Sequence, residues 1–288
     1  MTRFDPPVDP PAITKFANLA FHVPDDAKAI LVVIHGLAEH SARYRPTIEF
    51  LGERGVGCVS WDQYGHGCAP VSEADRGDVP SFQRFVVDAA AVIEVTRGRY
   101  PKLPLFLWGH SMGAVIATLT TAYIAKISPA KIRGVVTSSA PVASFDGVPR
   151  WLVNWLKYVA LIVPRLRVSR PFKPERLSRD AGVGHRYAED PLVPRAVTLR
   201  LLVQLALACR QCLPAARRLR TPWLALHGDD DEVAPAIGSQ RLIDALGSDD
   251  KLLRRFPGAR HEVHNEIEPT RTQCLQCLAD WVSERATQ

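Results

Sequence analysis

The chain carries the pentapeptide Gly109-His110-Ser111-Met112-Gly113 between two apolar segments. The run before it, Leu103–Trp108, predicts a buried strand, and the run after it, Ala114–Lys126, predicts a helix. A serine on a strand-to-helix corner, with glycine two residues to either side, is typical of a nucleophile elbow. Side chains at the two glycine positions would collide with the neighbouring helix and strand. The turn should present the Ser111 hydroxyl beside a helix N-terminus, where developing negative charge is stabilised.

Length and composition are those of a globular protein. A chain of 288 residues is long for one domain, but single α/β domains often reach this size, and 47% hydrophobic residues suffice for a large core. The first eleven residues are proline-rich and lack the basic-then-apolar pattern of a secretory signal. No run approaches the roughly 18–20 apolar residues of a membrane span. A soluble, cytoplasmic protein is therefore expected.

Six cysteines include two pairs at i,i+3 spacing, Cys209/Cys212 and Cys274/Cys277. A four-cysteine zinc site is one interpretation, but both pairs lie in predicted helices without the glycine-rich knuckles of such sites. Buried thiols on helix faces are the simpler interpretation, and they imply a reducing compartment. Neither a metal nor an organic cofactor is expected.

Apolar strands alternate with helices through most of the chain. Uninterrupted apolar strands separated by helices indicate a mostly parallel sheet that is covered on both faces. The predicted strands are Ala12–Val23 (a leading strand or hairpin), Ala29–Ile34, Val56–Trp61, Leu103–Trp108, Ile132–Thr137, Trp223–Leu226 and Leu252–Phe256, and the predicted helices are Phe82–Thr96, Ala114–Lys126, Ile237–Leu246 and Pro269–Arg285.

The segment 142–220 interrupts this alternation and predicts an inserted helical cap. It divides the chain into core residues 1–141, cap residues 142–220 and core residues 221–288. Lysine and arginine far outnumber aspartate and glutamate in the cap, whereas the rest of the chain has a small excess of acid. This asymmetry indicates a cap surface that faces something anionic.

One apolar face in the cap has two interpretations. It can pack on the core as the roof of a pocket, which is slightly favoured, or its tryptophans and the arginines beside it can dock on a membrane or micelle surface. One helix could do both. The residues concerned are Trp151, Trp155, Val159 and Ile162 at helical spacing, Pro164 after them, and then Arg165, Arg167 and Arg170.

A catalytic serine needs a base that is itself oriented by a carboxylate. On a strand–elbow–helix fold the partners follow in the order serine, acid, histidine. An acidic loop, 227–233, follows one predicted strand, and a histidine-containing loop, 258–262, follows the next. All three groups thus come at carboxyl ends of strands, where parallel sheets place their active sites.

The oxyanion of an acyl transfer needs two backbone N–H groups directed at one point. Met112, directly after the serine, is expected to supply one. The other is expected from the loop after the Ala29–Ile34 strand, where Leu37 is the natural donor and Gly36 lets the backbone approach the substrate. His35 could be mistaken for a second base, but a strand-end residue before glycine is expected to brace the loop.

Together these motifs resemble the α/β-hydrolase superfamily, in particular its monoacylglycerol lipase and lysophospholipase branch, over residues 25–285. Segment 35–44 is similar to the branch's His-Gly-x-x-Glu-His-Ser-x-Arg-Tyr loop, 62–67 to its Asp-x-x-Gly-His-Gly turn, 109–114 to its elbow, and 188–193 to a cap segment. The branch's His-Gly-x-x-Asp-x-Val-x-Pro motif selects Asp231 as the acid. Its histidine motif selects His261 over His264. A departure at Cys68, where relatives carry a polar residue, leaves substrate contacts there undefined.

The resemblance implies an α/β-hydrolase sheet of about eight strands, with the cap between the sixth and seventh. It implies that Ser111, Asp231 and His261 hydrolyse the ester of a single-chain lipid, a monoacylglycerol or a lysophospholipid, through an acyl-enzyme. The excess of basic residues in the cap favours a phosphate-bearing substrate or an anionic membrane surface. An esterase, acyltransferase or peptidase acting on another small acyl substrate is the alternative, and a non-catalytic binding protein is the remote one. Nothing indicates a nucleic-acid partner, and the oligomeric state is not specified.

Overall fold

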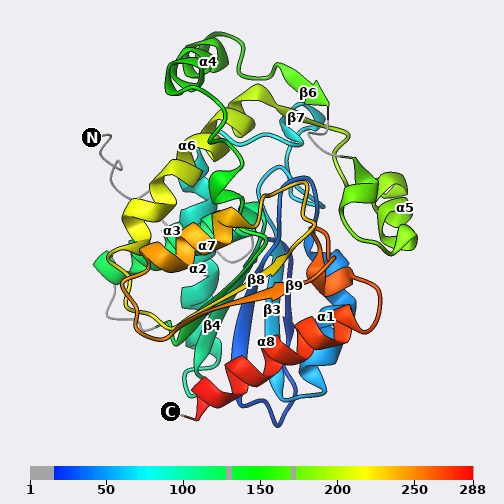
Figure 1. Cartoon of the computed structure of the whole chain (residues 1–288), viewed down its shortest axis with the longest axis vertical. Coiled ribbons are helices and arrows are strands. Elements are labelled where there is room, and N and C mark those ends of the chain that lie inside the picture. Colours follow the sequence, from blue (N-terminus) through cyan, green and yellow to red (C-terminus); the bar gives the residue numbers. More distant parts are fainter. Residues whose placement is uncertain (1–15, 128–131, 170–172, 288) are drawn as a thin grey trace.

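The computed structural model describes residues 16–127, 132–169 and 173–287 (Figure 1). Within them the central sheet has seven strands in the order β1-β3-β2-β4-β5-β8-β9. Only the edge strand β1 is antiparallel to its neighbour, and all other pairings in this sheet are parallel. The strands are β1 (Ala17–His22), β2 (Ala29–Ile34), β3 (Val56–Asp62), β4 (Leu105–His110), β5 (Gly134–Ser138), β8 (Trp223–Gly228) and β9 (Lys251–Phe256).

Helices cover both faces of the sheet (Figure 1). Alternate residues of β2 belong to two separate hydrophobic clusters, one on each face, which is why this strand is apolar throughout. The helices on one face are α2 (Phe82–Arg99), α3 (Met112–Ile127), α6 (Leu199–Ala216) and α7 (Ile237–Ala245), and those on the other are α1 (Arg45–Gly52) and α8 (Thr270–Ala286).

The predicted α/β sheet is confirmed, and β2 has the predicted bounds. The described residues form seven strands of this sheet, where about eight were predicted. Within the expected leading strand, β1 occupies Ala17–His22, while residues 1–15 lie outside the described part of the chain. Strand β4 extends two residues beyond its predicted end, because Gly109 and His110 still pair with β5.

Between β5 and β8 the chain leaves the sheet, so the insertion follows the fifth strand of the sheet among the described residues. Two of its helices, α4 and α5, lie above the sheet at the upper left and right of Figure 1. The inserted elements are η4 (Pro141–Ala143), α4 (Arg150–Ile162), β6 (Arg167–Ser169), η5 (Pro174–Arg176), α5 (Ala181–Glu189), β7 (Ala196–Thr198) and α6, with β6 and β7 paired antiparallel.

Helix α4 presents its tryptophans to solvent. Trp151, Trp155 and Ile162 are 70%, 58% and 81% exposed, and the helix instead buries Val153 and Ala160. The interpretation of this face as a pocket roof packed on the core was therefore wrong. Helical spacing identifies an apolar face, but it does not say what lies against that face. Arg170, which was grouped with this face, lies outside the described residues.

Helix α6 is, within the described residues, the one helix long and apolar enough to cross a bilayer. The expectation that no run approaches this length overlooked it, because Arg200 and Arg210 interrupt the apolar sequence. Most of its buried residues, among them Leu201 and Leu205, belong to the core cluster shared with α3. Its place in the fold is that of a core helix.

The two cysteine pairs lie on opposite faces of the sheet. Cys209 and Cys212 are buried on α6, whereas Cys274 and Cys277 lie on α8 in the other hydrophobic cluster. Because the sheet separates the pairs, they cannot share one zinc ion.

Candidate active site

Ser111 lies at the corner between β4 and α3 in a strained conformation, with φ of +52°. Its N–H donates to the Ser138 carbonyl of β5 at 2.9 Å. A Cβ on Gly109 would lie 2.1 Å from the Gly113 carbonyl oxygen, and one on Gly113 would lie 2.0 Å from that of Ile34. Both glycines are therefore required by the helix and the neighbouring strand, as predicted for a nucleophile elbow.

Asp231 and His261, from the loops after β8 and β9, are buried and in contact. His261 Nδ1 lies 2.8 Å from Asp231 Oδ2. The backbone N–H groups of Val233 and Ala234 donate to Asp231 Oδ1 at 2.9 and 2.8 Å. His227 Nε2 lies 3.2 Å from Oδ2. These contacts hold the carboxylate in one orientation toward the imidazole.

The pKa values of this pair move in opposite directions. Burial alone would raise the pKa of Asp231, but the attraction of His261 and hydrogen bonds from His227 and His261 lower it. Burial alone would lower the pKa of His261, but the charge of Asp231 and its hydrogen bond raise it above 6.5. The carboxylate thus both orients the imidazole and makes it a stronger base.

Ser111 and His261 line one small pocket. Its volume is about 10 Å³, room for about one water molecule. Leu177 and Tyr187, from the segment between β5 and β8, contribute to its lining. The lining residues are Gly36, Leu37, Glu39, His110, Ser111, Leu177, Tyr187, His261 and Glu262.

The loop after β2 passes close to Ser111. A Cβ on Gly36 would lie 3.2 Å from the Ser111 Cβ, and the Gly36 N–H donates to the Glu39 carboxylate. Leu37 comes next and lines the pocket, while Met112 is buried at the first position of α3. The two residues expected to supply oxyanion donors thus flank the serine.

His35 has both ring nitrogens occupied. Its Nε2 accepts the Gln63 N–H at 3.0 Å, so Nδ1 carries the proton and donates to the Gly36 carbonyl at 2.9 Å. Burial and the nearby His66 lower the pKa of His35 to about 3. The neutral ring thus joins the end of β2 to the turn after β3.

A buried ionic cluster borders the pocket. Arg43 Nη2 lies 2.6 and 2.7 Å from the two carboxylate oxygens of Glu262, and Arg43 Nε lies 3.3 Å from Glu39 Oε2. The Tyr44 hydroxyl donates to Glu39 at 2.9 Å. Burial alone would raise the pKa of Glu262, but the attraction of Arg43 outweighs it and lowers the pKa.

The four residues of this ionic cluster had no individually predicted role. Glu39 and Arg43 lie four residues apart, but Glu39 is in the loop before the 3-10 helix Ser41–Tyr44, so no helical pattern predicts their contact. Glu262 lies 219 residues from Arg43 in the chain, and no local pattern joins them. The same holds for Leu177 and Tyr187, which reach the site from the insertion.

Two other motif segments contact the loop after β2. Asp62 Oδ1, in segment 62–67, accepts hydrogen bonds from the N–H and hydroxyl of Ser41 at 2.9 and 2.7 Å. Asp190 Oδ2, in segment 188–193, lies 2.8 Å from His40 Nε2. Both segments therefore help to position the loop that carries Leu37.

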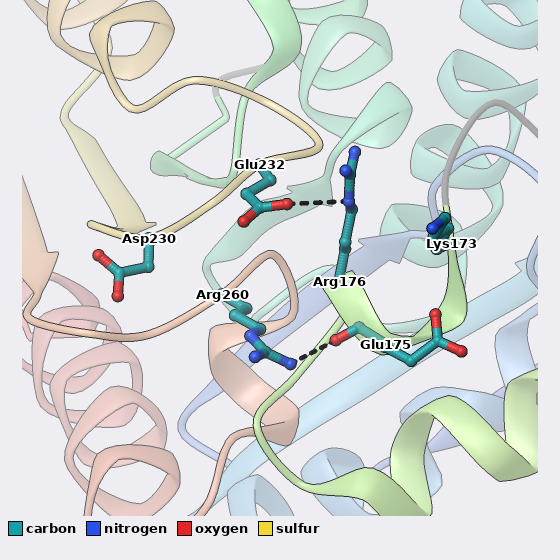
Figure 2. Close-up of a pocket in the computed structure, with 6 residues that line it drawn as sticks. All are labelled: Lys173, Glu175, Arg176, Asp230, Glu232 and Arg260. Carbon is teal, nitrogen blue, oxygen red and sulfur yellow. Dashed lines mark hydrogen bonds and ion pairs between the residues drawn. The ribbon is translucent and has the colours of Figure 1, made fainter.

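A second pocket, of about 350 Å³, is lined by charged residues (Figure 2). Arg176 Nε pairs with Glu232 at 2.9 Å, and Arg260 donates to the Glu175 carbonyl at 2.5 Å. With no apolar residue among those described around it, this pocket offers nothing to an acyl chain. Its lining consists of Lys173, Glu175, Arg176, Asp230, Glu232 and Arg260.

Across the described ranges, no group of three or more histidine, cysteine, aspartate or glutamate residues is placed to hold a metal ion.

Comparisons with known proteins agree with this geometry. The model of a family described as serine aminopeptidase, S33, matches residues 25–268. A monoacylglycerol lipase of Mycolicibacterium smegmatis is 31% identical over 258 residues, which cover 89% of each chain. A human monoglyceride lipase is 33% identical over 260 residues, covering 90% of this chain and 83% of the relative. The crystal structure of Paleococcus ferrophilus monoacylglycerol lipase matches with a TM-score of 0.80 at 30% identity, covering 93% of this chain and 98% of that one.

Proposed function

The chain belongs to the serine aminopeptidase S33 family, as an α/β-hydrolase of the monoacylglycerol lipase type, and on this premise we propose that it hydrolyses monoacylglycerols through an acyl-enzyme on Ser111. It is a carboxylic-ester hydrolase that acts on lipid esters. The observation that carries the assignment of residues is the contact between Asp231 and His261, at a pocket that His261 shares with Ser111.

In the proposed mechanism, Ser111 Oγ attacks the ester carbonyl carbon while His261 takes the hydroxyl proton. Asp231 holds the imidazole and stabilises its protonated form. The N–H groups of Leu37 and Met112 receive the oxyanion. The bond to the alcohol breaks as His261 returns the proton to the departing glycerol oxygen. A water molecule deprotonated by His261 then releases the fatty acid and restores Ser111.

The polar wall of the pocket favours a neutral headgroup. Glu39 and Glu262 line it, and the described lining contains no lysine or arginine. The nearby Arg43 is already bound by both carboxylates, so its charge is not free to receive a phosphate. Glycerol hydroxyls can donate hydrogen bonds to carboxylates, whereas a phosphate would be repelled by them. These contacts favour a monoacylglycerol over a lysophospholipid, despite the basic surface of the insertion.

The test is fatty-acid release from monooleoylglycerol and from an oleoyl lysophospholipid, measured side by side. We expect kcat/KM to be about 10²-fold higher for monooleoylglycerol, because like charges brought together cost several kcal/mol. Glu262→Gln removes one negative charge from the pocket and should therefore reduce the ratio of kcat/KM for monooleoylglycerol to kcat/KM for the lysophospholipid.

Equal rates on both lipids, or faster cleavage of the lysophospholipid, would contradict the headgroup assignment. Cleavage of short nitrophenyl esters alone, in a Ser111-dependent way, would leave an esterase, acyltransferase or peptidase acting on a different small acyl substrate.

We also propose that residues 142–220 act as a cap that closes the site and docks on lipid surfaces. A pocket of about 10 Å³ is too small for an acyl chain, so we infer that the segment that carries Leu177 and Tyr187 moves when substrate enters. The exposed face of α4, with Trp151 and Trp155, is suited to insertion at a membrane interface. Such docking would make the enzyme a peripheral membrane protein.

Trp155→Glu is expected to lower activity on vesicles or micelles about tenfold, because an exposed apolar side chain contributes roughly 1.5–3 kcal/mol when it is buried in lipid. Activity on short soluble esters should change little. The matched control is Leu252→Glu, which places the same charge at a 48% exposed apolar site on β9. Equal losses on dispersed and soluble substrates would rule out docking through this face.

A further inference from the structure

The peptide group between His261 and Glu262 is hydrogen-bonded on both sides. The His261 carbonyl accepts the hydroxyl of Ser139 at 2.6 Å. The Glu262 N–H donates to the carbonyl of Leu177, also at 2.6 Å. Ser139 follows β5 of the sheet, whereas Leu177 belongs to the insertion. One peptide group next to the imidazole is therefore bound to the core on one side and to the insertion on the other.

Ser139 occupies a position where the backbone alone would favour glycine. Its φ is +51°, and its side chain is fully buried. Its N–H donates to the Leu226 carbonyl of β8 at 2.9 Å, which holds the residue between β5 and β8. The strained conformation directs the hydroxyl at the His261 carbonyl, a hydrogen bond that glycine could not make.

The two bonds differ in what happens to them when substrate enters. Leu177 lines the pocket and belongs to the insertion, so in the opening proposed above its bond to Glu262 would be disturbed. Ser139 is buried in the core and bonded to β8, so it would not move with the insertion. We propose that Ser139 is a positioning residue, whose hydroxyl keeps the His261 backbone in register with Asp231 and Ser111 while the cap opens. This inference rests on the proposed catalytic roles of those three residues.

The test compares Ser139→Ala and Ser139→Gly on a short soluble ester, p-nitrophenyl butyrate. Both variants lose the hydroxyl, but glycine also relieves the backbone strain. We expect kcat to fall between about 10- and 10²-fold in both, with KM nearly unchanged, because small misplacements of a catalytic group have effects of this size. The folded fraction of each variant is measured by circular dichroism and thermal unfolding. If the alanine variant fails to fold, kcat of the glycine variant alone tests the role of the hydroxyl.

The matched control is Thr96→Val, which also removes a buried hydroxyl that donates to a backbone carbonyl, that of Val92 on α2 at 2.7 Å. It should keep wild-type kcat. A Ser139→Gly variant with wild-type kcat, or one whose only change is a higher KM, would overturn the inference. Ser111→Ala distinguishes a failure of the proposed function from a failure of the positioning role of Ser139. If it retains turnover, the proposed function fails, and if it is inactive while Ser139→Gly is fully active, only the positioning role fails.

Discussion

Replacing Ser111 with alanine is expected to abolish ester hydrolysis while the protein stays folded. Loss of the nucleophile removes the covalent route, and the loss of kcat should approach the ~10⁶-fold seen when a triad member is removed from serine hydrolases. The exchange deletes one hydroxyl at a half-buried position and leaves Cβ in place. Fatty-acid release from monooleoylglycerol and the midpoint of thermal unfolding give the two readouts.

Ser144→Ala is a suitable control, because it deletes a hydroxyl without a hydrogen-bond partner among the described residues, just after η4. It should leave both readouts unchanged. Turnover near the wild-type rate in Ser111→Ala would show that the nucleophile lies elsewhere.

The second large effect is expected from Asp231→Asn. It should lower kcat/KM by about 10⁴-fold, since the imidazole loses the carboxylate that orients it and stabilises its charge. The pH profile should also change. His261 acts as a base only when neutral, so wild-type kcat/KM rises with pH through a pKa that Asp231 holds above 6.5. Burial, which lowers that pKa, remains in the variant, so the midpoint should move to lower pH.

Other groups around His261 keep acting on its pKa in this variant. Glu262 and Glu39 also raise it, so the midpoint should fall without reaching that of a fully buried, unpaired histidine. Kinetics on a short soluble ester from about pH 5 to pH 9 cover the expected range.

Asp230→Asn is the matched control for this prediction. Asp230 is adjacent in sequence, but its side chain lines the charged pocket of Figure 2. This variant should keep the wild-type rate and midpoint. An unchanged midpoint in Asp231→Asn, or the same loss in Asp230→Asn, would mean that the acid is wrongly assigned.

The sequence by itself determined the features that depend on neighbouring residues. The buried strand β2 follows from six consecutive apolar residues, and the elbow follows from two glycines whose Cβ atoms would overlap nearby backbone. The order of the catalytic candidates along the chain followed from the alternation of strands and helices. The choice of Asp231 among three consecutive aspartates came from the spacing of a family motif, and the structure places it against His261.

Only the tertiary structure decided which distant residues meet. The Arg43–Glu262 ion pair, the meeting of Leu177 and Tyr187 with Ser111 and His261 at one pocket, and the bond from Ser139 to His261 each join segments more than sixty residues apart. The path of the chain across the sheet and through the insertion sets these contacts, and local periodicity contains no information about that path. For the same reason the apolar spacing of α4 predicted a face correctly but not its exposure, because exposure depends on what the rest of the chain places against the helix.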